Sequence, residues 1–303
     1  IPSGDLIRDM GTGLLVTSMI GSTINPGEFD YFLGGTFVRP GVFNPDTDLT
    51  ATLFGKREFN ETYKETSTGA SLSLTNYYSD QLTFTGGVFA NFGEFEDAFG
   101  TRQFFTTGLQ GDVTYDARDS KLEPTEGIYA RFDAKPLYEW EFGNAAARLE
   151  AEGRTYFDFG TDGNSVLAGR VKLGSLLGPS LSQTPPSMLF TAGGGNSVRG
   201  YSFKSIGVTG PGGDTIGGAS LLEVSAEFRQ RLNEGFGVVA FADAGTVGRS
   251  SFVDFSEDVK FGVGLGIRYY TGLGPIRLDV AIPLNRGPDD AGFAIYAGIG
   301  QSF

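Results

Sequence analysis

The chain has 303 residues, contains neither Cys nor His, and carries a formal net charge of −13 at pH 7. Without Cys and His it can form no disulfide, no thiolate metal site and no Ser-His-Asp or Cys-His catalytic group, although two carboxylates could still catalyse a reaction. The acidic balance argues against nucleic acid as a partner, because phosphate binding needs a basic face. We therefore expect a protein that is not an enzyme, holds no metal and binds no nucleic acid.

The sequence is rich in Gly (47 residues), Phe (27) and Tyr (12), which are spread along it without a short period. This composition is typical of a transmembrane β-barrel with aromatic girdles at the membrane surfaces. No stretch reaches the roughly 18 consecutive apolar residues that a transmembrane helix needs. Residues 1–23 show no charged, apolar and cleavable leader, so the sequence is interpreted as that of a mature chain.

Almost the whole chain alternates between apolar residues and polar or small residues with a period of two, which is the signature of β-strands. In Val259–Tyr270 the odd positions are apolar, whereas most of the even positions hold Gly, Lys or Arg. The alternation predicts about fourteen strands, near residues 12–22, 29–39, 48–60, 66–78, 81–95, 102–116, 126–138, 146–158, 165–174, 219–231, 236–247, 259–271, 274–285 and 293–303.

The predicted fold is all-β: one transmembrane antiparallel β-barrel domain that spans residues 1–303. A soluble sandwich also alternates, but strands of about 10 to 14 residues are longer than the usual soluble strand of about 5 to 6. Charges of both signs on the polar faces of neighbouring strands favour a barrel, since they can pair in a lumen. The residues expected to face lipid include Leu265, Val280 and Ile282, and the lumen-facing positions expected to accept polar residues include Gly264 and Ala281.

Loop lengths predict the orientation of the barrel. Short turns such as Leu232–Gly235 and Thr271–Gly274 alternate with longer loops such as Gly248–Asp258. Barrels of the bacterial outer membrane have short periplasmic turns and longer extracellular loops. We therefore expect a strict alternation of short and long connections, an outer-membrane location in a Gram-negative bacterium, and both termini in the periplasm.

One connection, Gly174–Gly218, is far longer than ordinary loops and contains no clear strand. Within it, Gly193–Phe203 reads GGGNSVRGYSF and resembles the loop motif of the outer-membrane assembly-factor superfamily typified by BamA and TamA. Val198, Arg199, Gly200 and Tyr201 match the VRGY element of that motif. Further segments resemble the family in the same order, most strongly from Asp116 onwards and with last strands most like TamA: Asp116–Gly127, Ser225–Phe228, Phe241–Gly245, Gly274–Asn285 and Gly298–Phe303.

The resemblance implies a barrel of sixteen strands with a long loop folded into its lumen, preceded by periplasmic POTRA domains. The sequence departs from this pattern in two respects. No POTRA domain is present in the chain, and about nine strands precede the motif where the family has eleven, although five follow it as in the family.

For the motif itself, the resemblance implies that Arg199 docks on acids at Glu227 and Asp243. Glu227 faces the lumen by alternation, but Asp243 lies in a strand whose two faces are both apolar, so its direction stays open. The alternative is a solvated loop arginine. A buried Arg needs carboxylate partners, which is why a long, apolar and Gly-rich loop favours the docked arrangement.

The terminal strand carries the residues expected at a lateral seam, namely Gly298, Gly300 and Phe303. The alternating residues Phe293, Ile295, Ala297, Ile299 and Phe303 are expected to face lipid. Glycine in a strand weakens its pairing. The two glycines therefore predict either a weak closing seam or an adaptation to a curved wall.

The function implied by the resemblance is assembly of outer-membrane proteins. The seam opens, and an unfolded β-barrel or autotransporter client adds a strand to the exposed edge through backbone hydrogen bonds, without a cofactor. Lipid, lipopolysaccharide and a periplasm-spanning protein are the other expected partners. The alternatives are a passive porin-like channel, a two-partner secretion pore, and a barrel that anchors a missing N-terminal domain. A porin leaves its lumen open, whereas an assembly factor fills it with the motif loop.

Overall fold

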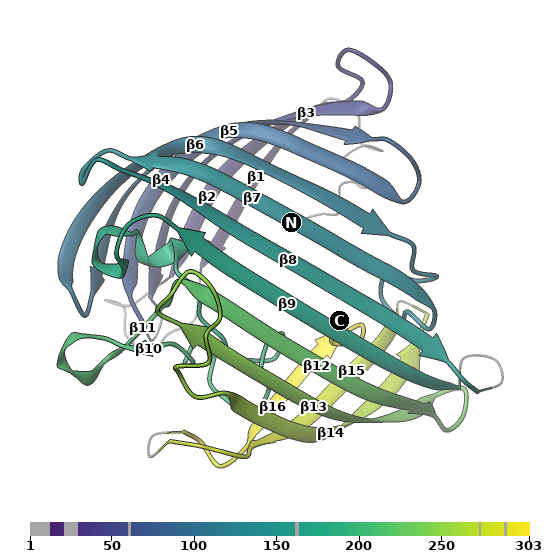
Figure 1. Ribbon diagram of the computed structural model, residues 1–303. Coiled ribbons are helices and arrows are strands. Elements are labelled where there is room, and N and C mark those ends of the chain that lie inside the picture. The colour runs from purple at the N-terminus through teal and green to yellow at the C-terminus, as the bar shows by residue number, and fades with distance from the viewer. Residues whose placement is uncertain (1–12, 21–29, 60–61, 161–163, 273, 288–289) are drawn as a thin grey trace.

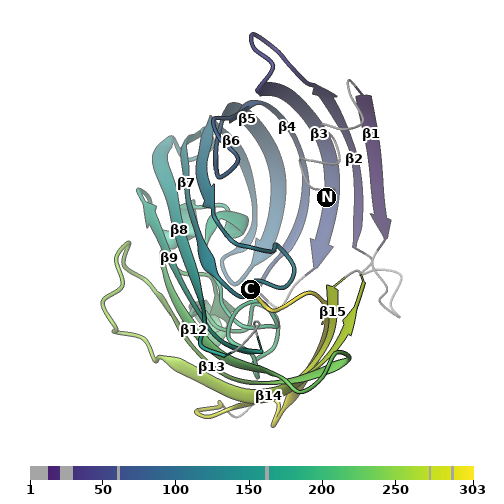
Figure 2. The same cartoon turned by 90° about the vertical axis from the view of Figure 1, so that its right-hand side faces the viewer.

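The computed structural model describes residues 13–20, 30–59, 62–160, 164–272, 274–287 and 290–303, and it shows an antiparallel sheet of fourteen strands in chain order (Figure 1). The sheet curves strongly, so that it has an inner and an outer face (Figure 2). The strands are β1 (Gly13–Ile20), β2 (Tyr31–Arg39), β3 (Thr47–Phe59), β4 (Lys64–Tyr77), β5 (Leu82–Asp97), β6 (Gly100–Asp116), β7 (Gly127–Glu139), β8 (Asn144–Asp158), β9 (Ser165–Leu177), β12 (Ser220–Arg231), β13 (Phe236–Gly248), β14 (Lys260–Thr271), β15 (Gly274–Pro283) and β16 (Ala294–Ile299).

The predicted all-β fold is confirmed, with nine strands before the long connection and five after it. Each strand of the sheet pairs with its neighbours in the chain order, and β9 pairs with β12 across the connection. Among the residues that the structure describes, no ladder joins β1 to β16. None of the described helical segments is long and apolar enough to cross a membrane.

The two faces of the sheet carry the predicted residue types. Leu265 is 69% exposed on the outer face, and Val280 and Ile282 are exposed beside it. Arg268 and Asp279, one position out of phase, are fully buried on the inner face. A sheet with an apolar outer face and a charged inner face has the reverse pattern of a soluble protein and is suited to contact with lipid.

The expectation that Gly264 and Ala281 accept polar residues is wrong, although both lie on the inner face. A Cβ added to Gly264 would lie 2.2 Å from the carbonyl oxygen of Val280 and 2.3 Å from the ring of Phe241. Ala281 is completely buried and packs with Phe241. The inner wall is therefore close-packed at this level rather than open to water.

The expected strict alternation of connection lengths holds only in the C-terminal half. The rim that carries the long connection, here called the loop rim, also carries the longer segment between β13 and β14. However, β5 and β6 are joined at the same rim by Ala98 and Phe99 alone. The periplasmic placement of both termini remains a prediction.

The long connection, residues 178–219, forms a small structure of its own on the inner side of the sheet (Figure 2). It contains the two-stranded sheet β10 (Val208–Thr209) and β11 (Thr215–Ile216) and three short 3-10 turns, Leu181–Gln183, Pro186–Met188 and Pro211–Gly213. Its apolar residues, among them Phe190, Ala192 and Ile206, form one buried cluster with Leu221 of β12 and Val247 of β13. Burial of these side chains attaches the connection to the wall.

The end of the chain differs from the sequence prediction. Strand β16 ends at Ile299, and Gly300 has a positive φ of 85°, a conformation that favours glycine. Phe303 therefore does not face lipid: it is 7% exposed and packs against Tyr156 and Val166 on the inner face. Gly300 and Phe303 thus leave the terminal strand, and of the three predicted seam residues only Gly298 lies within it.

Candidate functional site: a buried ion cluster that docks the motif segment

The motif segment, Gly193–Phe203, lies at the end of a narrow loop within the connection. Isolated backbone bridges join Phe190 to Gly218 and Ala192 to Ile206, so the chain enters and leaves the segment side by side. The backbone amide of Gly193 donates to the Ser197 hydroxyl at 2.9 Å, which closes the first turn of the segment. This framework presents Val198 and Arg199 to the inner wall, where they are 0% and 1% exposed.

Arg199 is held by Asp243 of β13 through a two-pronged ion pair. Its Nε donates to Asp243 Oδ2 at 2.7 Å and its Nη2 donates to Asp243 Oδ1 at 2.9 Å. The backbone amide of Arg199 donates to the same carboxylate at 3.1 Å. This parallel geometry is the strongest and most direction-dependent contact that Arg makes with a carboxylate. The structure thus places Asp243 on the inner face, which alternation had left open.

Two further acids complete the surroundings of the guanidinium. Arg199 Nη1 donates to Glu227 Oε1 of β12 at 2.6 Å and lies 3.7 Å from Asp279 Oδ2 of β15. The guanidinium carbon lies 3.5 Å from the ring centroid of Phe241, which adds a cation–π contact. All three carboxylates are fully buried, and the contacts of the segment extend over the four neighbouring strands from β12 to β15.

The surplus negative charge is balanced by two wall arginines. Arg229 Nε donates to Glu227 Oε2 at 2.9 Å, and Arg268 Nη1 donates to Asp279. With Arg199 there are therefore three cations against three anions, which is the condition for burying charge without a large penalty. Only Asp243 depends on Arg199 alone for a cationic partner among these contacts, because Glu227 and Asp279 each keep a wall arginine.

Glycines allow the motif backbone to approach the wall closely. A Cβ at Gly262 of β14 would lie 1.8 Å from the carbonyl oxygen of Arg199, and a Cβ at Gly245 of β13 would lie 2.6 Å from Val198. Gly200 has a φ of 103°, and a Cβ there would lie 2.9 Å from the backbone of Ile282. Glycine at these positions serves both a close approach and, at Gly200, a left-handed backbone.

The connection also contacts the opposite part of the wall. Lys204, directly after the motif segment, forms an ion pair of 3.0 Å with Glu58 of β3. Arg148 of β8 donates from its Nε to the carbonyl oxygen of Met188 at 3.1 Å. The connection therefore bridges the interior from β3 and β8 to β12–β15, near the loop rim.

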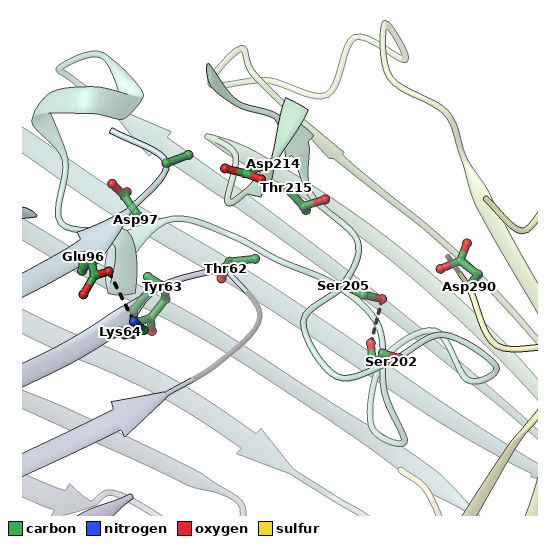
Figure 3. A pocket seen from close by; sticks show the side chains of 11 residues that line it. Thr62, Tyr63, Lys64, Glu96, Asp97, Ser202, Ser205, Asp214, Thr215 and Asp290 are labelled. Atoms are coloured by element: carbon green, nitrogen blue, oxygen red, sulfur yellow. Dashed lines mark hydrogen bonds and ion pairs between the residues drawn. The ribbon is translucent and has the colours of Figure 1, made fainter. Parts of the chain in front are cut away.

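A polar pocket of about 450 Å³ lies beside the motif segment at the loop rim (Figure 3). Lys64 pairs there with Glu96 at 3.3 Å, and Asp97 pairs with Arg102 at 2.5 Å. These pairs tie neighbouring strands together, and we assign no binding role to the pocket. Within the part of the chain that the structure describes, no group of three or more acidic side chains is arranged to hold a metal ion.

Sequence reasoning named Arg199, Glu227 and Asp243, which the structure brings together. It missed Asp279, although alternation in β15 already placed this acid on the same face as Arg277 and opposite the lipid-facing residues. It also missed the role of Tyr296 in β16, whose hydroxyl lies against the motif backbone. Gly298 and Gly300 lie outside the ion cluster, whereas the carbonyl oxygen of Phe303 accepts from Arg229 of the cluster at 3.0 Å. The role of all three residues at a seam remains a prediction.

Comparison with known proteins gives the family of the chain. A model of the Omp85 superfamily domain matches residues 18–303. The chain belongs to the Omp85 superfamily. It is 30% identical over 275 residues to the outer membrane protein assembly factor BamA of Nitratidesulfovibrio vulgaris, a match that covers 84% of this chain and 34% of that protein. The chain thus spans about a third of the length of this relative.

Solved structures show the same fold for this Omp85 chain. BamA from Haemophilus ducreyi lacking POTRA domains 1–3 superposes with a TM-score of 0.74 at 17% identity, covering 88% of this chain and 61% of the other. CdiB from Escherichia coli gives a TM-score of 0.58 at 12% identity, covering 94% and 55%. The chain is thus a BamA homologue with an outer-membrane β-barrel fold, and a special likeness to TamA remains a prediction.

Proposed function

We propose that this Omp85 chain is the membrane-embedded part of a factor that assembles other proteins into the outer membrane. The observation that supports the proposal most directly is the docked motif segment, with Arg199 buried against Glu227 and Asp243. The similarity to a BamA assembly factor points to the same activity. Unfolded β-barrel or autotransporter proteins are the proposed clients.

The connection that crosses the interior near the loop rim argues against a passive porin-like channel. The connection contacts β3 and β8 on one side and β12 to β15 on the other. Four ion pairs and a cluster of apolar side chains hold it there. A porin needs an open aqueous channel instead. A lumen crossed by the connection therefore favours a function at the barrel wall over the passage of solutes through the barrel.

The proposed route for a client is the edge of β16. Six residue pairs join β15 to β16, whereas sixteen join β5 to β6. Gly298 lies in this short ladder and offers no side chain for packing against a neighbouring strand. An added client strand gains backbone hydrogen bonds at such an edge, which is β-augmentation and needs neither a nucleotide nor a metal.

The proposal also covers the surroundings of the barrel. The apolar outer face would contact lipid and lipopolysaccharide, both termini would lie in the periplasm, and a periplasm-spanning protein would deliver clients. Secretion of a single partner protein and anchoring of a separate domain are the remaining candidates. Neither is favoured by a particular contact in this structure.

The absence of Cys allows a direct test by crosslinking. The chain is reconstituted in liposomes as Ala297→Cys, which places a thiol on the outer face of β16, and supplied with an unfolded β-barrel client that carries one Cys in its terminal strand. We expect client folding to accelerate, and a disulfide to form with Ala297→Cys but not with the matched control Ala226→Cys in β12.

Other outcomes would point elsewhere. A steady ion conductance without accelerated client folding would support the porin. Transport of the client into the liposome interior, without insertion, would support a secretion pore. Equal crosslinking at Ala297→Cys and Ala226→Cys would overturn the proposed role of the β16 edge.

A further inference from the structure

Among the hydrogen bonds of the described residues, those between the edge strand β16 and the motif segment come from one side chain, Tyr296. We infer that Tyr296 couples the two, so that β16 is held more firmly in the sheet while the motif segment is docked. The inference deepens the proposed function, because it assigns to one residue the link between the Arg199 cluster and the seam. Tyr296 would be a positioning residue rather than a group that contacts the client.

The hydroxyl of Tyr296 is bonded on both sides to the motif backbone. The backbone amide of Gly200 donates to it at 3.0 Å, and the hydroxyl donates to the carbonyl oxygen of Tyr201 at 3.1 Å. The Tyr296 ring lies against Gly195, where an added Cβ would be 2.9 Å from the ring. One side chain of the edge strand is thus bonded within the VRGY element itself.

The inner face of β16 offers no equivalent to this contact. Of its other inward positions, Ala294 carries only a methyl group and Gly298 has no side chain, so neither can form a side-chain hydrogen bond. Arg277 donates to Asn196 at 3.1 Å, but it belongs to β15. The described contacts therefore make Tyr296 the bonded link between β16 itself and the motif segment.

The link extends to the ion cluster by two routes. Gly200 directly follows Arg199, so the amide that Tyr296 accepts from is fixed by the docking of the guanidinium on Asp243. The Tyr296 ring also packs against the cluster that contains Phe241, and Phe241 carries the guanidinium on its face. Undocking of Arg199 therefore removes the hydrogen-bonded support of Tyr296, whereas its packing against the wall residues remains.

The support that Tyr296 gives to β16 is important because the ladder between β15 and β16 is short. Strand β16 has six pairs with β15 and no ladder to β1 in the part of the chain described. A strand paired on one side opens at a low free-energy cost, and contacts with its inner face then decide how often it opens. Coupling of this kind must be reciprocal: loosening β16 also loosens the motif segment.

The test uses Tyr296→Phe, which keeps the ring and removes the hydroxyl. Hydrogen exchange of the full chain is followed in liposomes without a client. Because two hydrogen bonds are lost, we expect exchange of the β16 amides to accelerate on the order of tenfold. The matched control is Tyr138→Phe in β7, which removes the hydroxyl of a ring that packs on Trp140 in a strand paired with β6 and β8, and it should leave β16 unchanged.

A double-mutant cycle separates coupling from a local loss of stability. Arg199→Ala alone should accelerate exchange in β16, but it should have little further effect in the Tyr296→Phe background. Additive effects of the two substitutions, or unchanged β16 exchange in Tyr296→Phe, would overturn the coupling.

These exchange results do not depend on assembly activity. If Tyr296→Phe loosens β16 but the unmodified chain fails to assemble clients, the coupling holds and the proposed function fails. If the chain assembles clients but hydrogen exchange in β16 is unchanged by Tyr296→Phe and by Arg199→Ala, the function holds and the coupling fails.

Discussion

Replacing Arg199 by Ala should release the motif segment while leaving the barrel folded. The substitution removes three side-chain hydrogen bonds, two to Asp243 and one to Glu227. Glu227 keeps Arg229 as a partner, so the damage falls mainly on Asp243, which retains only a backbone donor of the motif. Leaving one buried charge of a pair unpartnered typically costs about 3 to 5 kcal/mol.

That cost is local, because the wall is held by its ladders and not by the connection. At about 1.4 kcal/mol for each factor of ten, the population of the undocked segment should rise about a hundredfold to several thousandfold. Hydrogen exchange of residues 193–206 in liposomes measures this rise. Exchange in β5 and β6, joined by sixteen residue pairs, should stay slow.

The mechanism makes a specific rescue prediction. If the unpaired Asp243 causes the loss, Arg199→Ala combined with Asp243→Asn should be less mobile than Arg199→Ala alone. Arg199→Lys should rescue poorly, because an ammonium cannot reproduce two parallel hydrogen bonds. Arg131→Ala is the control, since Arg131 pairs with Asp112 and Asp133 of the wall. Unchanged exchange in Arg199→Ala, or no relief from Asp243→Asn, would refute the reasoning.

Two further predictions concern the lipid face and a turn. Leu265→Arg should cost about 2 to 4 kcal/mol if the residue lies near mid-membrane, whereas Ile276→Arg near a rim should cost about 0 to 1 kcal/mol; reversible unfolding in bilayers measures both, and equal costs would contradict the assigned depth. Partial burial raises the pKa of Asp119 in the β6–β7 turn, but hydrogen bonds from Thr125 and Glu126 outweigh it and hold the pKa below its usual range. Because the folded-state pKa is depressed, the turn should stay ordered above the ordinary carboxyl pKa and loosen as the pH falls through the lowered value; exchange of residues 117–126 should show this in the unmodified chain and lose it in Asp119→Asn.

Much of the fold could be predicted from alternation, because one face of each strand meets lipid and the other does not. The pattern fails where this contrast is lost. In β13 the inward residues Val239 and Phe241 are as apolar as the outward ones, because they pack beneath the motif segment and against the inner wall. The direction of Asp243 was therefore undecidable from its own strand, and it became clear only from its contact with Arg199.

The terminal residues show a second limit. The apolar alternation of the sequence is interrupted at Gln301 and returns at Phe303, whereas the ladder ends at Ile299. Gly300 turns the chain inwards, and Arg229 of β12 donates to the carbonyl oxygen of Phe303 at 3.0 Å. A period-two pattern records which side chains are apolar, and an apolar side chain suits the packed interior as well as lipid.

Docking through charged groups affects how the motif segment can change between a docked and a released position. Apolar side chains alone would bind the connection to the wall but would tolerate small displacements, since dispersion and burial vary gradually with position. A buried guanidinium between Asp243 and Glu227 tolerates none, because a displaced charge loses its partners and is not yet hydrated. The ion cluster therefore favours an abrupt change between a docked and a released motif segment over a gradual displacement, and an element of this kind can pass its state on to the edge strand through Tyr296.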